Sequence, residues 1–401
     1  MTLFERHARP GFVAHAVAVD GVEVDVPVRV FYPGYYPTLV RLYRELGVPS
    51  EPVNYASSFT GEDGVPFFRY RNLLVGARSW SYVLPQDLRH APARRVLAGA
   101  LRFRRQARVA LESGTLAGRT IGEFVAALEL PREFVDGLLL PAIATICTCP
   151  YDAARAFPAA TIVEYLERGV TREAVRRAVP GAQAVVERVL GALEEVALSA
   201  PVSGLRRDDG GVRLQRADRA GRPFDRLDRL DRLDRFDHVV LATQANQALA
   251  LLDDAAPAER ALLAAFDYRP IEVLMHHDER LMPRARRHWS AVNLLVAPQA
   301  LQPQSTIWLN AVMPALRARL PVFQTVHPLV APREEHVIAR TRLERPVVSA
   351  ASEAALAALE RLHAEPGRRL WFCGSYAERG VPLLESAVRS AARVVERIGR
   401  G

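Results

Sequence analysis

Alternating hydrophobic and polar residues predict strands in several parts of the chain. Residues 16–31 alternate around an Asp-Gly pair at 20–21, which predicts two strands joined by a tight turn. Residues 202–217 repeat the pattern around 209–211 and predict a second hairpin. Short apolar runs flanked by polar residues predict further, more deeply buried strands. We expect these strands at residues 2–5, 237–243 and 368–375.

Apolar residues three or four positions apart predict helices over much of the remaining chain. Residues 37–48 have this spacing, and the pattern is mostly helical over residues 72–195. Within that stretch, Thr120 and Glu123 have the spacing of a capping box, which marks the start of a helix. A long closing helix is expected over residues 386–399.

Strand segments recur near the start, the middle and the end of the chain, with helical blocks between them. This arrangement predicts an α/β fold assembled from distant stretches, with a second, helix-rich domain inserted between them. A repeat of Asp-Arg-Leu triplets over residues 224–236 is expected to be a solvated surface expansion. We assign residues 1–55, 196–250 and 366–401 to the first domain, and residues 56–195 and 251–365 to the second.

Composition narrows the function classes and the compartment. The 401 residues carry 53 basic side chains, all of them arginine, and a net charge of +8. Arginine without lysine is typical of a GC-rich bacterial genome, and acids are interleaved with the arginines, so we expect no nucleic-acid partner. The chain has no run of ~18 apolar residues, which argues against a transmembrane span. Three cysteines do not make a disulfide framework, so a cytoplasmic location is expected.

Metal and acid–base sites are poorly supported by the cysteine and histidine pattern. Cys147 and Cys149 form one spaced pair without the further ligands that a zinc site needs, so we expect a buried structural role and no metal. Cys373 follows two aromatic residues in a predicted buried strand, where it would act as a small hydrophobic residue. His276 and His277 could act as a base, but we favour a surface-loop position for them.

Several segments resemble one protein family in their sequence and order. TLFERHARPGF (residues 2–12) resembles the second strand and turn of the FAD domain in flavin amine-oxidase-like proteins. These include phytoene-desaturase-like enzymes and bacterial NAD/FAD-binding oxidoreductases. The resemblance spans nearly the whole chain. The other similar segments are VFYPGYYPTLVRLYRELGVPSEP (30–52), PAIATICTCPYDAARAFPA (141–159), HVVLATQANQALALL (238–252) and RLWFCGSYAERGVPLLESAVRSAARVVERIG (369–399).

The resemblance implies an FAD-binding Rossmann-like parallel sheet and assigns residues to the adenosine end of the cofactor. Glu5 closes the second strand, where the family's acid accepts hydrogen bonds from the ribose hydroxyls. Gly11 matches the first of two glycines that let the backbone approach the pyrophosphate. Val202 matches the hairpin residue whose backbone pairs with the adenine edge.

The C-terminal motif implies contacts with the flavin end. Gly374 and Ser375 match the segment that approaches the ribityl and pyrophosphate groups. Residues 385–390 (ESAVRS) resemble the start of the family's last helix, whose positive end faces the pyrimidine edge of the isoalloxazine ring. Ala387 and Val388 would supply the amides there.

The chain departs from the family pattern at several positions. The GxGxxG loop and its first strand would lie about 30 residues before residue 2, and the chain begins too late to contain them. Without that strand, both neighbouring strands would keep unpaired backbone edges. Phe12 replaces the second glycine, and Val26-Pro27 replaces a Thr-Gly pair. Two explanations remain open, namely a start codon further upstream or a remnant that has lost FAD.

The leading functional hypothesis is an FAD-dependent oxidoreductase that transfers hydride from an apolar, lipid or polyene substrate to the flavin. No conspicuous catalytic side chain is expected, because the isoalloxazine accepts the hydride and the protein supplies orientation and burial. Peripheral contact with a membrane is compatible with such a substrate. The alternative is a cofactor-free remnant that binds a hydrophobic ligand or a protein.

Overall fold

The parallel sheet of the predicted cofactor half is present as two separate pairs of strands. The computed structural model describes residues 1–76, 78–170, 174–216, 235–317 and 319–399. β1 (Thr2–Phe4) pairs in parallel with β10 (Glu195–Ala197), and β14 (Val239–Leu241) pairs in parallel with β20 (Leu370–Phe372). The three buried strands predicted from the sequence are therefore confirmed. Each pair joins segments that lie more than a hundred residues apart in the chain.

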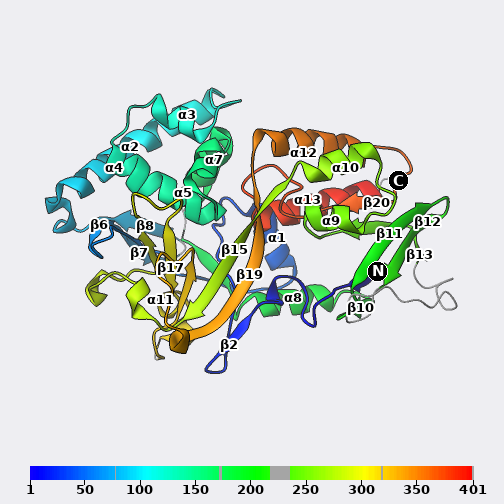
Figure 1. Cartoon of the computed structure of the whole chain (residues 1–401), viewed down its shortest axis with the longest axis horizontal. Coiled ribbons are helices and arrows are strands. Elements are labelled where there is room, and N and C mark those ends of the chain that lie inside the picture. Colours follow the sequence, from blue (N-terminus) through cyan, green and yellow to red (C-terminus); the bar gives the residue numbers. More distant parts are fainter. Residues whose placement is uncertain (77, 171–173, 217–234, 318, 400–401) are drawn as a thin grey trace.

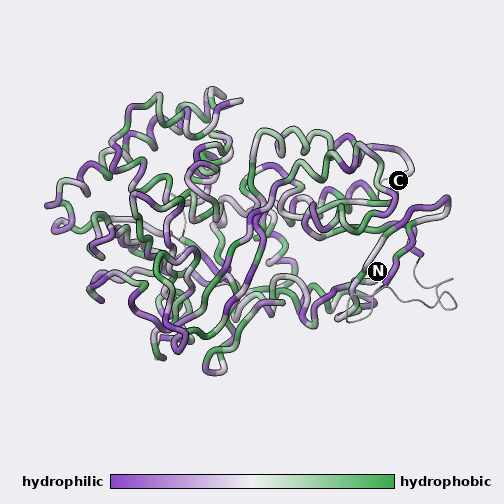
Figure 2. The backbone as a smooth tube through the Cα atoms, in the orientation of Figure 1, coloured by the Kyte–Doolittle hydropathy of each residue, from purple (hydrophilic) through white to green (hydrophobic). Residues whose placement is uncertain are grey.

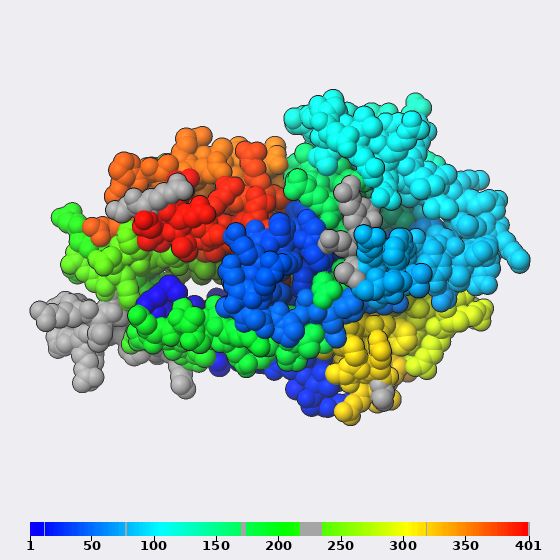
Figure 3. Space-filling model, turned by 180° about the vertical axis from the view of Figure 1, so that it is seen from behind, coloured from blue at the N-terminus to red at the C-terminus, as the bar shows by residue number. Residues whose placement is uncertain are grey.

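Within the described residues, no strand joins the two pairs into one sheet. In Figure 1 the β14–β20 pair belongs to the upper right lobe, whereas β10 and α8 (Ala182–Leu190) lie below it. Figure 3 shows a hollow between the green surface of the lower segment and the red surface of α13 (Leu384–Ile398).

Side chains accept hydrogen bonds from two amides on the edge of β20 that faces away from β14. The amide of Cys373 donates to the carbonyl of Leu241, so the neighbouring Phe372 amide points to the opposite edge. That amide donates to Nε2 of His363 at 3.2 Å. Next along the edge, the Gly374 amide donates to the Ser390 hydroxyl at 2.9 Å. Two amides of this edge therefore bond to side chains of neighbouring helices and not to another strand.

Helices and a hairpin sheet enclose the hydrophobic core around β14 and β20. The hairpin predicted near residue 209 is β11 (Val202–Asp208) and β12 (Gly211–Arg216), and β13 (Arg235–Phe236) extends it. The rest of the Asp-Arg-Leu repeat, residues 224–234, lies outside the described residues. The covering helices are α9 (Ala245–Leu251), α10 (Pro257–Ala264), α12 (Ala350–His363) and the predicted closing helix α13.

The N-terminal hairpin and the helix after it also match the sequence. β2 (Val17–Val19) and β3 (Val22–Val24) pair across Asp20 and Gly21. Both turn residues have positive φ angles, +47° and +79°, as a type I′ turn requires. The predicted helix after them is α1 (Pro37–Glu45).

A seven-stranded sheet forms the centre of the other half and was not predicted. Its order is β19-β15-β18-β17-β16-β5-β6, and only the β16–β5 pair is parallel. Several of its strands are short and buried on both faces, so they lack the period-two pattern. The strands are β5 (Ser57–Thr60), β6 (Pro66–Arg69), β15 (Asp267–His276), β16 (Val292–Leu295), β17 (Gln304–Trp308), β18 (Phe323–Val326) and β19 (Val337–Val347).

A helical cluster packs against one end of this sheet (Figure 1). The capping box is confirmed, since the Thr120 hydroxyl accepts from the Glu123 amide and the Glu123 carboxylate accepts from the Thr120 amide. Hydrophobic and hydrophilic residues alternate along these helices (Figure 2). The helices are α2 (Ala91–Glu112), α3 (Ile121–Ala126), α4 (Arg132–Phe134), α5 (Leu140–Cys147), α6 (Tyr151–Ala156) and α7 (Ala159–Tyr165).

The helical interpretation is wrong at the start of its stretch. Residues 71–82 form a hairpin of β7 (Arg71–Val75) and β8 (Arg78–Tyr82), because alternate apolar residues such as Leu73 and Trp80 pair across the strands. Two shorter strands, β4 (Ser50–Pro52) and β9 (Arg176–Ala178), pair in antiparallel orientation. Among the described helices, none is long and apolar enough to cross a membrane.

Candidate functional site

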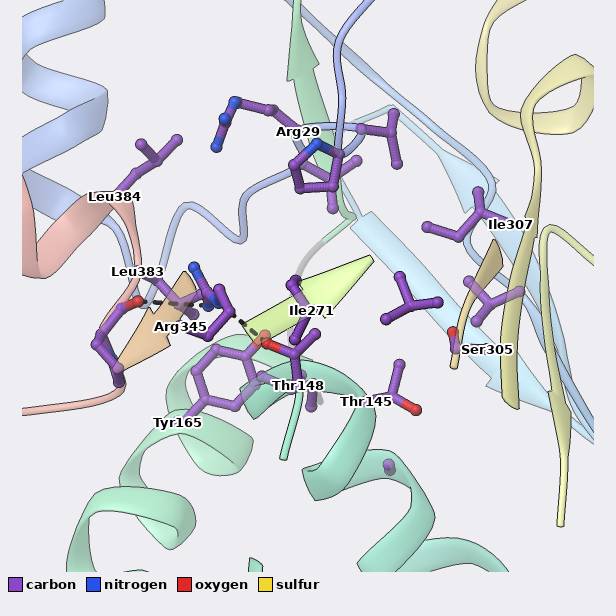
Figure 4. A pocket seen from close by; sticks show the side chains of 18 of the residues that line it. Arg29, Thr145, Thr148, Tyr165, Ile271, Ser305, Ile307, Arg345, Leu383 and Leu384 are labelled. Atoms are coloured by element: carbon purple, nitrogen blue, oxygen red, sulfur yellow. Dashed lines mark hydrogen bonds between the residues drawn. The ribbon is translucent and has the colours of Figure 1, made fainter. Parts of the chain in front are cut away.

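One large cavity runs between the two halves of the molecule. Its volume of about 1550 Å³ exceeds the roughly 300–1,000 Å³ of ordinary small-molecule pockets. It receives residues from the N-terminal loop, the ends of β14 and β20, the start of α13, the central sheet and the helical cluster. Figure 4 shows its middle section. The cavity is therefore large enough for a dinucleotide and a second ligand.

The loop after β1 forms one end of the cavity, and Glu5 organises it. His7 and Gly11 line the cavity. The Glu5 carboxylate accepts hydrogen bonds from the amides of both, at 2.8 and 3.5 Å. Gly11 has φ of +59°, a left-handed conformation that favours glycine. Glu5 itself is not among the lining residues, and its role toward a ribose stays a prediction. Val202 also lies off the cavity, half-buried against the β14–β20 core.

Gly374 and Ser375 line the middle of the cavity at the end of β20, where they were expected. Gly374 has φ of +147°, which disfavours any residue with a side chain. A Cβ atom there would lie 3.2 Å from the Tyr376 ring and 3.4 Å from the Thr243 carbonyl oxygen. The backbone is therefore exposed to the cavity only because residue 374 is glycine.

The start of α13 faces the cavity through Ala387, whereas Val388 packs against the cluster around α1. The Ala387 amide already donates to the Leu383 carbonyl, so the amides of the preceding turn are those without an intrahelical partner. No side chain caps this helix, so its positive end stays available.

Glu385 has a structural task that the sequence did not reveal. Its buried carboxylate accepts from the amides of Thr38 and Leu39, at 3.1 and 2.9 Å, and so caps α1. The next residue, Ser386, donates its hydroxyl to the carbonyl of Val381 at 2.8 Å. These bonds hold the start of α13 in place beside the cavity.

The segment that departs from the family pattern is fixed by buried hydrogen bonds. The Asp25 carboxylate accepts from the Ala182 amide, and burial raises the pKa of this carboxyl. Gln324 donates to the Asp25 carbonyl and accepts from the Val28 amide, at 2.7 and 2.8 Å. Pro27 between them lines the cavity and offers no amide donor.

The far end of the cavity is apolar and aromatic. Tyr36 and Trp80 line it. Burial raises the pKa values of the tyrosines here, which keeps them neutral. Other lining residues at this end are Tyr55, Phe59, Tyr70, Phe103, Phe134, Leu138, Leu139, Tyr165, Val292, Leu294 and Ile307.

Two cavity arginines escaped the sequence analysis. Arg29 follows the Pro27 segment, and Arg345 lies on β19, beside the loop before α13 (Figure 4). Arg345 donates from Nε to the Thr148 hydroxyl at 3.0 Å and from Nη2 to the Pro382 carbonyl at 3.5 Å. Burial lowers the pKa of both groups, to about 10 for Arg29. No local pattern distinguishes these arginines from the chain's many others.

The structure gives different outcomes for the histidine and the cysteine predictions. His276 is fully buried at the end of β15 and hydrogen-bonds the Thr325 hydroxyl at 2.8 Å, so the surface-loop interpretation is wrong for it. Burial lowers its pKa to about 4. The three cysteines are all buried and unpaired, which confirms the structural interpretation. Among the described residues, no cluster of potential metal ligands is present.

Comparisons with known proteins agree with this geometry. The family described as "NAD(P)-binding Rossmann-like domain" matches residues 1–46. No curated protein matches the sequence. A fatty acid isomerase from P. acnes that produces CLA superposes with a TM-score of 0.64 and 16% identity, covering 99% of this chain and 92% of that one.

Two amine oxidases superpose almost as well. Wild-type putrescine oxidase bound to putrescine gives a TM-score of 0.61 at 13% identity, with 100% of this chain and 93% of that chain covered. Cyclohexylamine oxidase from Brevibacterium oxydans gives 0.60 at 14% identity, with 99% and 93% covered. These superpositions confirm, for the fold, the resemblance to flavin amine-oxidase-like proteins.

Proposed function

We propose that the protein is an FAD-dependent oxidoreductase that transfers hydride from an apolar substrate to the flavin. The observation that carries this proposal is the single cavity, which connects the Gly11 loop, Gly374 and the uncapped end of α13 with an aromatic chamber. Residues 1–55, 196–250 and 366–401 would hold the cofactor. Residues 56–195 and 251–365 would supply the substrate chamber.

The cavity residues fit an extended cofactor of this kind. Glu5 and Gly11 would meet the adenosine and pyrophosphate end, and the bare backbone at Gly374 leaves room that a Cβ would fill. The start of α13 offers partial positive charge, which stabilises electron density on the pyrimidine edge of the ring. When bound, the flavin supplies the hydride acceptor, and the chain's residues orient the substrate and exclude water.

The aromatic and aliphatic wall at the far end supports an apolar substrate. The superposed proteins include a fatty acid isomerase and a cyclohexylamine oxidase, whose names refer to substrates with substantial hydrocarbon parts. We propose a lipid or polyene substrate on this basis.

The test is FAD binding followed by anaerobic reduction. The purified protein is incubated with FAD, desalted, and its visible spectrum recorded. Retained, protein-perturbed flavin absorption supports the proposal, and bleaching of that absorption by an apolar substrate without oxygen supports hydride transfer. A folded protein that leaves the FAD spectrum unchanged and retains no flavin would refute it.

A cofactor-free hydrophobic-ligand or protein-binding module remains the second candidate, because two observations favour it. His363 and Ser390 already accept from amides on the edge of β20 opposite β14. Pro27 removes an amide from the cavity wall. In the same experiment, this candidate predicts binding of a fluorescent alkyl probe with no response to FAD.

We further propose that the β7–β8 hairpin contacts an anionic membrane surface. One face of the hairpin lines the cavity through Asn72 and Ser79. The other face is largely solvent-exposed, with exposed fractions of 55% for Leu73 and 49% for Trp80, which also borders the cavity. Its other exposed side chains are Val75, Tyr82, Arg71 and Arg78. Aromatic and basic side chains together favour the interface of an anionic bilayer.

Vesicle co-sedimentation tests the membrane contact. The wild-type protein is expected to sediment with phosphatidylglycerol-containing vesicles more than with pure phosphatidylcholine, and a Leu73→Ser, Trp80→Ser double variant should lose this binding. Leu301→Ser is the control, because Leu301 is 78% exposed away from the hairpin. Equal sedimentation of both variants would contradict the proposal.

A further inference from the structure

Two arginines from distant parts of the chain lie in the middle of a largely apolar cavity. Figure 4 shows Arg29 and Arg345 in the section of the cavity that also contains Leu383 and Leu384, at the start of α13. The neighbouring wall is apolar and contains Ile271. The positive end of α13 adds to the charge of the two guanidinium groups. Two cationic side chains and a helix N-terminus therefore meet in one section of the cavity.

The hydrogen-bond partners of Arg345 are neutral. It contacts the Thr148 hydroxyl and the Pro382 carbonyl, and within the described part of the chain it forms no ion pair. Burial is the main cause that lowers the pKa of Arg29; the Asp25 carboxylate opposes this effect, and the nearby charge of Arg345 lowers the pKa further. A half-buried cation without a counterion favours an anion beside it, so an anion in the cavity would be stabilised.

The carboxylates that line the cavity are committed elsewhere. Glu344 accepts from the Asn246 side chain at 3.0 Å and is exposed. Glu167 lies 3.5 to 4.0 Å from the guanidinium groups of Arg104 and Arg108. Neither of these two lining carboxylates therefore pairs with Arg345.

A further polar atom in the same section lacks a partner. The Thr145 hydroxyl lines the cavity, is buried, and makes no hydrogen bond among the described residues. It lies on α5, one turn before Thr148, whose hydroxyl already contacts Arg345. A ligand with hydrogen-bond acceptors would satisfy it.

We propose that Arg345, assisted by Arg29, binds the carboxylate of an otherwise apolar substrate, so that the acid head lies near the start of α13 and the hydrocarbon extends into the aromatic chamber. The planar guanidinium fork matches a carboxylate in two parallel hydrogen bonds. This inference deepens the proposed function by naming the substrate class, a hydrophobic carboxylic acid. Binding of the acid does not itself require FAD.

The test compares a medium-chain fatty acid with its methyl ester, below the micellar concentration, by calorimetric titration with and without FAD. The wild-type protein is expected to bind the acid about 10- to 100-fold more tightly than the ester, the range of a charge-assisted pair. Arg345→Gln should abolish this preference and leave ester binding unchanged, which also shows that the variant is folded. Arg345→Lys should retain part of it.

Arg342→Gln is the matched control, because Arg342 lies on the same strand and lines the cavity but has a 90% exposed side chain. An unchanged acid preference in Arg345→Gln, or no preference in the wild-type protein, would overturn the proposal. The proposal would also be overturned if added FAD removed the acid preference and Arg345→Gln bound FAD more weakly than the wild-type protein. Arg345 would then bind the flavin and not the substrate. An acid preference in a protein that ignores FAD supports this inference and refutes only the proposed oxidoreductase activity.

Discussion

Removing the charge of Glu259 is expected to loosen the half of the molecule proposed to hold the cofactor. Glu259 is buried on α10 and accepts two hydrogen bonds from Arg207 of β11, at 2.7 and 2.8 Å. It also accepts one at 3.1 Å from Arg368, which lies just before β20. One carboxylate thus ties the hairpin and a helix to the strand that leads to Gly374. Burial raises the pKa of Glu259, but the bonds and charge of Arg207 outweigh it and hold the pKa low.

The size of the effect follows from the burial of the two arginines. The Arg368 side chain is only 5% exposed, whereas that of Arg207 is 30% exposed. Breaking a buried pair costs about 3–5 kcal/mol because it leaves an uncompensated charge. Arg207 keeps Asp254 and Arg368 keeps Glu365, so we expect the lower end for Glu259→Gln. About 3 kcal/mol corresponds to a roughly 100-fold increase in local opening.

Hydrogen–deuterium exchange of peptides from β11 and β20 measures this opening directly. In Glu259→Gln, exchange there should be about 100-fold faster than in the wild-type protein, whereas exchange in α5 should be unchanged. Glu365→Gln is the control, because Glu365 contacts the same Arg368 at 3.4 Å but is 61% exposed. Its loss should cost about 1 kcal/mol or less. Equal exchange in the two variants would refute the reasoning.

Three further predictions concern the geometry around the cavity. Gly374→Ala should weaken FAD binding at least about tenfold, because the new side chain strains the backbone and fills space beside the cavity. Gly367→Ala is the control, because residue 367 has φ of +70° and open space around it, so this change should lower stability alone. Fluorescence titration with FAD distinguishes the two variants. Burial, followed by the charges of two nearby arginines, lowers the pKa of His363 to about 4 from 6.5, so the folded state favours the neutral ring. The stabilisation that the neutral His363 ring provides is complete above pH 6.5 and is lost as the pH falls toward 4. In His363→Gln, the free energy of unfolding measured with urea should therefore vary less with pH over that range. Glu385→Gln should destabilise the protein by about 1–3 kcal/mol by weakening the cap on α1, measured as a lower urea midpoint.

The parts of the fold that local pattern determines were predictable. The hairpin at Asp20 and Gly21 depends on two residues that tolerate positive φ, and both are visible in the sequence. The end of β20 was predictable for a similar reason, since Gly374 interrupts an apolar run and a helix follows. The cavity places Gly11, Gly374, Ser375 and Ala387 together, although they come from opposite ends of the chain.

The remaining features depend on contacts between distant segments. β5 pairs with β16 more than two hundred residues later, and such pairing leaves no period in either strand when both faces are buried. Arg345 is distinguished only by its neighbours from α5 and from the loop before α13. His363 closes the edge of β20 through a helix whose pattern reveals nothing of that bond.

An experimentally determined structure of the protein with FAD tests the central claim most directly. Our account predicts adenosine near Glu5 and Gly11, the ribityl chain along Gly374 and Ser375, and the isoalloxazine ring at the start of α13. A structure grown with excess FAD in which the cavity binds no flavin, or in which the ring lies away from α13, would contradict it.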